Sequence, residues 1–337
     1  MLIMITKRIL HLALVIIGMS LLMFIASRML PGDPAVMAAG GVDASPEMIE
    51  HARKEYGLDK PLFIQYILYI KQIIIERDLG RSFIDREPII DKLKLYYPAT
   101  FELAGFGILF ACLVGIPLGV ISAVKSGSII DNLSRVTSLF LVSMPIFWLG
   151  LMFIFIFYGV LNIFPYGARL SSNVGLPPHV TGILTIDCLF AGDFMKLKIV
   201  LLHLTLPSIV LGSISLGIIA RMTRASVLEV LTENYIITGR AKGLSEKTVI
   251  WKYAFRNATI PIITVIGIQL GVLMGGAVLT ETVFNWPGVG KFAIEAVDNK
   301  DYPSIMGFAL TYSFIYALVN MIIDIIYAWL NPKISIK

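Results

Sequence analysis

The sequence has few charged residues, few histidines and few cysteines. Charged residues make up 15% of the 337 positions, against about 25% in ordinary soluble domains, so a water-soluble enzyme is not expected. Two cysteines, Cys112 and Cys188, cannot build a disulfide framework or a zinc site. The histidines lack paired spacing, which argues against a metal site in this chain: His11, His51, His179 and His203.

Motifs of several function classes are also missing. The phosphate-binding pattern Gly-x-x-x-x-Gly-Lys-Ser/Thr does not occur, because its nearest counterpart, 288–292, has Asn285 where the first glycine belongs. There is no Gly-x-Ser-x-Gly nucleophile motif, no intramembrane proton relay and no selectivity-filter sequence. The basic residues form no single patch, so nucleic acid is not an expected partner. We therefore expect neither an enzyme nor a site for a cofactor on this chain.

Apolar residues dominate instead. They make up 57% of the chain, with a mean hydropathy of +0.81. Each of six apolar runs can cross a hydrocarbon core of about 30 Å. The sequence therefore predicts an all-α, polytopic membrane protein with six transmembrane helices, at 9–30, 100–124, 136–164, 200–220, 260–279 and 305–330. The first run is longer than a signal-peptide core and is interpreted as an uncleaved span.

Lysine and arginine set the expected orientation. The segments 1–8, 125–135, 221–258 and 331–337 hold 13 of the 28 basic residues, which places them and both termini in the cytoplasm. Counting 61–75 as a seventh span would place every later segment on the opposite side of the membrane. That stretch is short and is broken by polar residues, so we interpret it as an interfacial helix.

The chain divides into four parts: the N-terminal tail and first span (1–30), an extracytoplasmic helical segment (31–98), the transmembrane core (99–330) and a cytoplasmic tail (331–337). In the extracytoplasmic segment, Ser45, Pro46 and Glu47 are typical of a helix start, and Gly57 is a plausible stop. A second helix is expected to begin at Lys60-Pro61.

Inside the spans, glycines and a few ionisable residues stand out. Gly267, Gly271 and Gly275 recur every four residues and share one helix face, which suits internal packing or contact with a second membrane subunit. Glu102 and Asp324 are candidates for a translocation path. The alternatives are an internal pair for Asp324 and a membrane-surface position for Glu102.

The inner loop 221–258 is the most informative segment. Seven basic and three acidic residues give it a net charge of about +4. Its apolar residues share helix faces, Gly243 breaks the middle, and Ser245-Glu246 can begin a second helix. Two interpretations stay open: a helix on anionic lipid, or a docking element for a soluble partner.

The loop also carries motifs that resemble a known family. The stretch 235–244, with Gly243, and the triplet 256–258 resemble the coupling loop of ABC-importer permeases of the dipeptide, oligopeptide and nickel subfamily. Gly239 departs from the alanine common there. Further matching motifs follow in the family's order: 31–34, 56–61, 78–80, 143–148, 221–224, 281–290 and 301–303. Within this subfamily the chain is most similar to the first-type permease of dipeptide systems, and the similarity includes the inserted outer stretch 176–197.

The resemblance implies the type I ABC importer permease fold. It implies a second homologous permease subunit, two ABC ATPase subunits that hold ATP and Mg, and an extracytoplasmic substrate-binding protein, all in the cytoplasmic membrane of a prokaryote. Peptide is the expected cargo; nickel or a nickel chelate is the alternative, and a stand-alone channel or secondary transporter is less favoured. Met144 and Pro145 join the candidates for the translocation path. The expected coupling residues are Glu229, Tyr235, Arg240, Ala241, Lys242, Gly243, Leu244, Arg256 and Asn257.

Overall fold

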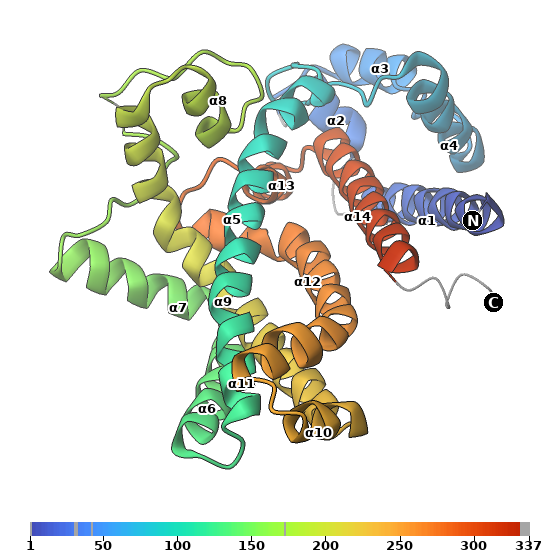
Figure 1. Cartoon of the computed structure of the whole chain (residues 1–337). Helices are drawn as coiled ribbons and strands as arrows, with labels where there is room; N and C mark the ends of the chain where they lie inside the picture. The colour runs from blue at the N-terminus through green and yellow to red at the C-terminus, as the bar shows by residue number, and fades with distance from the viewer. Residues whose placement is uncertain (1, 30–32, 42, 172, 331–337) are drawn as a thin grey trace. The chain divides into compact units, whose positions relative to one another are not determined.

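The computed structural model describes residues 2–29, 33–41, 43–171 and 173–330. Within these ranges the secondary structure is helical, apart from one isolated bridge between Arg81 and Pro88. The predicted C-terminal tail and the first half of the 31–34 motif lie outside them. The chain forms two compact units, Met1–Pro98 with Gly288–Leu318, and Ala99–Pro287 with Val319–Lys337. Figure 1 gives the order of the helices.

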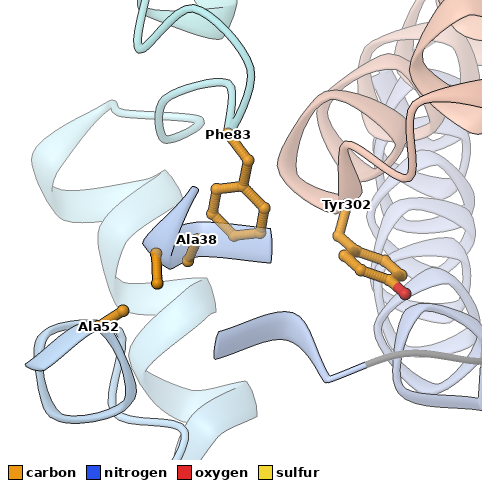
Figure 2. Packing of buried hydrophobic residues seen from close by; sticks show 5 residues of the cluster. Ala38, Ala52, Phe83 and Tyr302 are labelled. Carbon is orange, nitrogen blue, oxygen red and sulfur yellow. The ribbon is translucent and has the colours of Figure 1, made fainter. Parts of the chain in front are cut away.

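The first unit contains the first predicted span and the segment 31–98, which the sequence predicts to be extracytoplasmic. Its helices are α1 (Leu2–Met29), α2 (Pro34–Ala39), α3 (Pro46–Glu55), α4 (Leu62–Lys71) with a π-helical turn (Gln72–Glu76), the start of α5 (Ile89–Val124), α13 (Val289–Asp298) and the start of α14 (Tyr302–Leu330). Small side chains allow close packing here: Ala38, Ala39 and Ala52 lie in one buried cluster with Phe83 and Tyr302 (Figure 2).

The predicted helix boundaries of this segment agree with the structure. The Ser45 Oγ accepts a hydrogen bond from the Met48 N–H at 3.3 Å, and Pro46 is the first helical residue of α3. Gly57 follows the end of α3 with a φ of +61°, a conformation that glycine adopts at little cost. The interfacial helix predicted at 61–75 corresponds to α4 and its π-helical turn.

The second unit is built around α9 (Phe194–Leu231). It also contains the rest of α5 and of α14, α6 (Ile129–Ser143), α7 (Ile146–Phe153) with a π-helical turn (Ile154–Val160), α8 (Leu184–Phe190), α10 (Asn234–Ala241), α11 (Glu246–Thr248) with a π-helical turn (Val249–Phe255), and α12 (Arg256–Val283). Glycines bring α9 close to its neighbours: a Cβ on Gly212 would lie 2.4 Å from the Gly107 carbonyl oxygen, and one on Gly217 2.7 Å from the Ser138 carbonyl oxygen. Such contacts are typical of membrane helix interfaces.

Within the described part of the chain, five helices are long and apolar enough to cross a membrane, or six if the bent pair of α6 and α7 is one span. The six-span prediction agrees with the second count. The third span differs from a straight crossing, because its two halves are bent by 102°. Met144, between them, is extended (ψ +133°), as expected for a residue before proline, whose ring disfavours the helical conformation there.

Candidate functional site

The inner loop is more helical than a connector. Residues 221–231 continue α9, and 256–258 begin α12. Residues 232–255 project between these two helices, and we call them the α10–α11 element. Because α9 is unbroken over 38 residues, the element is attached directly to a helix that runs through the second unit.

Gly243 ends α10 with a Schellman motif. Its φ is +80°, its N–H donates to the Arg240 carbonyl at 2.9 Å, and the next N–H, of Leu244, donates to the Gly239 carbonyl at 3.2 Å. The Leu244 side chain closes over Gly239, with Cδ1 3.4 Å from the place of a Cβ. Alanine at Gly239 would therefore make an ordinary contact, whereas any side chain at Gly243 would be strained by the backbone conformation.

The α10–α11 element is held together on one side. Ile236 is buried with Val249 and Ala254. The Ser245 Oγ caps α11 by accepting a hydrogen bond from the Thr248 N–H, as the sequence predicted. Across the turn, Arg240 donates to both carboxylate oxygens of Glu246, at 2.8 and 3.2 Å. The two short helices thus form one body.

The expected coupling residues gather on and around this body. The Asn257 amide donates to the Tyr235 hydroxyl at 2.9 Å, which joins α10 to α12. Tyr235 is 43% exposed and Leu244 38%, next to a more exposed Ile237. The other expected members are exposed too: Glu229, Ala241, Lys242 and Arg256. An exposed apolar and basic surface on a rigid projection suits a groove on a soluble partner.

Asp131 joins three segments of the second unit. Its carboxylate is buried and accepts hydrogen bonds from the Ser122 hydroxyl at 2.6 Å, the Gly127 N–H at 2.9 Å, and Arg224 Nε and Nη2 at 2.6 and 2.8 Å. Arg224 lies on α9 and Ser122 on α5. The ion pair therefore fixes the turn between α5 and α6 to α9, two turns before the α10–α11 element.

Beside this ion pair lies a cavity of about 440 Å³ between α6 and α9. Its walls combine arginines with small and aliphatic residues: Asn132, Ser134, Arg135, Val136, Ser138, Leu139, Ala220, Arg221, Arg224 and Ala225. The candidate residues Met144 and Pro145 lie farther along, at the break that separates α6 from α7; Pro145 is exposed and Met144 is half-buried. A mixed polar and apolar wall beside a broken helix is compatible with a solute path.

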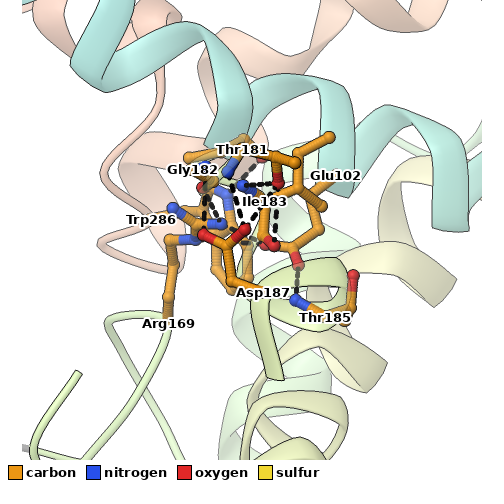
Figure 3. A network of polar contacts seen from close by, with 9 residues as sticks. Glu102, Arg169, Thr181, Gly182, Ile183, Thr185, Asp187 and Trp286 are labelled. Atoms are coloured by element: carbon orange, nitrogen blue, oxygen red, sulfur yellow. Dashed lines mark hydrogen bonds and ion pairs between the residues drawn. The ribbon is translucent and has the colours of Figure 1, made fainter. Parts of the chain in front are cut away.

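Glu102 lies in a second polar network of the second unit (Figure 3). Its carboxylate accepts hydrogen bonds from Arg169 Nη2 and Nε at 2.6 and 3.1 Å, and from the Thr185 N–H at 2.7 Å. Arg169 also donates to the Gly182 carbonyl oxygen at 2.8 Å and lies 6.0 Å from the centroid of the Trp286 ring. Glu102 thus fixes the segment 165–193 to α5.

Asp187 organises the same segment from within. It accepts hydrogen bonds from the Thr181 N–H and hydroxyl and from the Gly182 N–H, at 2.7–3.0 Å. Burial raises the pKa of this carboxyl, but the hydrogen bonds outweigh it, so the pKa lies below its usual value. His203 of α9 also holds this segment, because its ring contacts the Gly167 carbonyl oxygen and the Ser171 hydroxyl.

The remaining predicted residues are placed as follows. Gly267 packs inside the chain, because a Cβ there would lie 2.6 Å from Ile323 of α14. On the same helix, Gly271 is buried and Gly275 is half-buried. Asp324 belongs to α14, but its side chain lies outside the described part of the structure. No group of acidic, histidine and cysteine side chains among the described residues could hold a metal ion.

Sequence reasoning missed Arg169, Asp187 and the pair of Asp131 with Arg224. For Arg169 an indication existed: a buried carboxylate needs a cation, and this is the only basic residue between 136 and 195. Pairing Asp131 with Arg224 requires knowing that α6 lies next to α9, and the sequence alone does not give that proximity.

The comparisons with known proteins agree with this geometry. Residues 115–336 match the family described as the binding-protein-dependent transport system inner membrane component, and 1–104 match the N-terminal region of such membrane components. In Escherichia coli K12, the probable D,D-dipeptide transport system permease protein DdpB is 44% identical (96% of this chain, 95% of that protein), and the dipeptide transport system permease protein DppB is 43% identical (95% of each). The glutathione transport system permease protein GsiC of Escherichia coli O6:H1 is 36% identical over 98% of each chain.

Among solved structures, an inward-facing conformation of the MetNI methionine ABC transporter matches with a TM-score of 0.53 and 19% identity, over 73% of this chain and 99% of that one. This match supports the type I importer fold. The family covers well over half of the chain, and the relatives cover nearly all of it. The chain is therefore a multi-pass transporter subunit rather than an enzyme, and it belongs to the family of binding-protein-dependent transport system inner membrane components.

Proposed function

We propose that this chain is one of two permease subunits of an ATP-driven importer of dipeptides and oligopeptides. The relatives named above transport D,D-dipeptides, dipeptides and glutathione according to their names, which supports peptide cargo. Nickel or a nickel chelate remains the alternative cargo. Nickel favours imidazole ligands, and the scarcity of histidine in this chain weighs against it.

The α10–α11 element is the observation that carries this proposal. It is a small body with exposed Tyr235, Ile237 and Leu244, on the inner segment with the largest number of basic residues, seven. We assign it as the docking site of an ATPase subunit. A second, homologous permease would present the equivalent element to a second ATPase, and an extracytoplasmic binding protein would deliver the peptide at the opposite face.

This assignment implies an orientation in the membrane. The α10–α11 element and both termini lie in the cytoplasm, in keeping with the distribution of lysine and arginine. ATP and Mg would bind to the ATPase subunits, and this chain would hold no cofactor. When the ATPases close on ATP, they would displace the α10–α11 element. The unbroken α9 and the ion pair of Asp131 with Arg224 would transmit this displacement to the break at Pro145.

A pair of alanine substitutions tests the coupling role. Gly243→Ala forces a side chain into a left-handed conformation at a cost of about 1–2 kcal/mol, without a clash, since no atom lies within 4 Å of its Cβ. In the complex reconstituted with its ATPases and binding protein, we expect normal assembly but several-fold less peptide imported per ATP hydrolysed. The control, Gly239→Ala, adds a methyl group on the same helix and should retain the wild-type ratio. A wild-type ratio in Gly243→Ala would contradict the assignment.

A further inference from the structure

The first unit contains a small cavity that the transport function does not explain. It has a volume of about 140 Å³, and its lining includes Arg28, Phe24, Gln65, Tyr69 and Tyr302. Sites for drug-sized ligands begin at about 300 Å³. The cavity is therefore suited to a single small group rather than to a peptide.

Arg28 is held in place as the cationic wall of this cavity. Its Nε donates to the Gln65 Oε1 at 3.1 Å, and its guanidinium lies 5.0 Å from the centroid of the Phe24 ring. Gln65 is itself fixed, because its amide nitrogen donates to the carbonyl oxygens of Lys60 and Leu58, at 2.8 and 3.3 Å. Among the residues that line the cavity there is a second arginine, Arg81, and no aspartate or glutamate. The charged side chains in this lining are therefore both cationic, which favours an anion as the bound group.

Two tyrosine hydroxyls in the lining have no hydrogen-bond partner among the residues that the structure describes. Both the Tyr69 and the Tyr302 hydroxyls are buried, and Tyr302 as a whole is only 1% exposed. Figure 2 shows the Tyr302 hydroxyl directed away from the alanine cluster. Burial raises the pKa of the Tyr69 phenol, with a smaller contribution from Tyr66, so Tyr69 stays protonated and can donate. A buried hydroxyl without a partner costs about 1–3 kcal/mol, which an acceptor in the cavity would recover.

The surface around the cavity is apolar, which suits contact with the acyl chains of a lipid. On α4 and its π-helical turn, long side chains face outward; Phe63 is 73% exposed, and Ile74 and Ile75 are 69% each. On α1, the residues near Phe24 are also exposed and aliphatic: Leu21, Leu22 and Ile25. A helix with such a face lies in the membrane interface, where phosphate groups meet acyl chains.

We propose that this cavity binds the phosphate group of a membrane phospholipid. The Arg28 guanidinium would pair with the phosphate, and the hydroxyls of Tyr69 and Tyr302 would donate to its oxygens. The acyl chains would run over the apolar faces of α4 and α1. A phospholipid would then brace the first unit at the membrane surface.

Binding by the assembled importer tests this site. The complex is stripped of lipid in detergent and titrated with phosphatidylglycerol, with dioleoylglycerol, which lacks the phosphate, and with inorganic phosphate; bound lipid is counted by native mass spectrometry. We expect saturable retention of phosphatidylglycerol alone. Arg28→Gln should weaken retention by about tenfold to hundredfold, the effect of one charge-assisted hydrogen bond.

Two further variants keep the test decisive. Tyr302→Phe removes only the unpartnered hydroxyl, so it should preserve the fold and still weaken retention severalfold. Lys71→Gln removes one charge from the exposed end of α4 outside the cavity lining and should have no effect. Equal retention by the wild type and by both cavity variants would overturn the proposal, as would equal retention of dioleoylglycerol. Stabilisation of the complex by inorganic phosphate without lipid would assign the site to free phosphate and overturn the lipid assignment.

Discussion

Replacing Glu102 by glutamine should lower the local stability of the segment 165–193, while the side chain keeps nearly the same size and shape. Arg169 is only 11% exposed at its side chain, and the carboxylate beside it is fully buried. Removing one partner of a buried ion pair costs about 3–5 kcal/mol. We expect about 3 kcal/mol here, because the amide oxygen can still accept a hydrogen bond from Arg169.

Hydrogen exchange of backbone amides in the assembled complex measures this cost locally. A loss of about 3 kcal/mol in the opening free energy accelerates exchange by about two orders of magnitude. The amide to follow is that of Gly182, whose N–H bonds to Asp187 and not to Glu102. The Thr185 amide is unsuitable, because it donates to Glu102 directly.

Two controls separate the ion pair from other effects. Lys198→Gln removes an exposed charge near the same segment and should leave exchange at Gly182 unchanged. Combining Glu102→Gln with Arg169→Met removes both charges. The double variant should lose less stability than the two single variants together, because each single variant leaves one buried charge unpaired and the double variant leaves none. Unchanged exchange in Glu102→Gln, or strictly additive losses in the double variant, would refute the reasoning.

Three further predictions concern other contacts of the same chain. Gly267→Val should lower the thermal unfolding midpoint of the complex by overpacking against Ile323, at a cost of about 1–3 kcal/mol. Adding Ile323→Ala to this variant should restore part of the midpoint, and the control Gly18→Ala, where a Cβ would meet open space, should leave the midpoint unchanged. An unchanged midpoint in Gly267→Val would contradict the packing. Because the folded-state pKa of Asp187 is lowered, its stabilisation of the segment 165–193 is present above the unfolded pKa of about 3.9 and is lost as the pH falls through the folded value. The protection of the Val174 amide, which donates to the Ser171 carbonyl oxygen and not to Asp187, should therefore fall below about pH 4. Asp187→Asn should flatten this dependence, whereas an equally steep profile in the variant would contradict it. Asp131→Asn should weaken the attachment of the α5–α6 turn to α9, measured as faster exchange of the Ser128 amide, which donates to the Lys125 carbonyl oxygen and not to Asp131. Lys125→Gln in the same turn should match the wild type, and equal exchange in both variants would rule out the attachment.

Local chemistry made much of the helical pattern predictable. Ser45 and Ser245 cap helices where the sequence placed them, because a cap depends on residues within one turn. Gly243 adopts positive φ at the predicted break. The count of apolar runs also agreed with the structure when the bent pair is taken as one span, since span length follows from membrane thickness.

Prolines show where local reasoning ends. Pro207 and Pro261 lie inside continuous helices, whereas Pro145 marks a sharp bend. All three lack an N–H and clash with the preceding turn. Whether the helix continues depends on how neighbouring helices satisfy the freed carbonyl groups, and that information is not in the local sequence.

Long-range polar pairs were hidden for a related reason. Glu102 and Arg169 are 67 positions apart, and Asp131 and Arg224 are 93 apart. Hydropathy identifies the helices but not which helix faces which. The close approach of α9 to α5 and α6 depends on glycines at facing positions, and only the structure pairs those positions.

Import by the reconstituted complex tests the central claim most directly. Vesicles that contain both permeases and enclose both ATPases are supplied outside with the binding protein, and with labelled dipeptide, longer peptides and nickel in competition. We predict peptide uptake that requires ATP inside and the binding protein outside, and that nickel does not reduce. Uptake that persists without the ATPases would contradict the account of a permease driven from the α10–α11 element, and uptake of nickel alone would contradict its cargo.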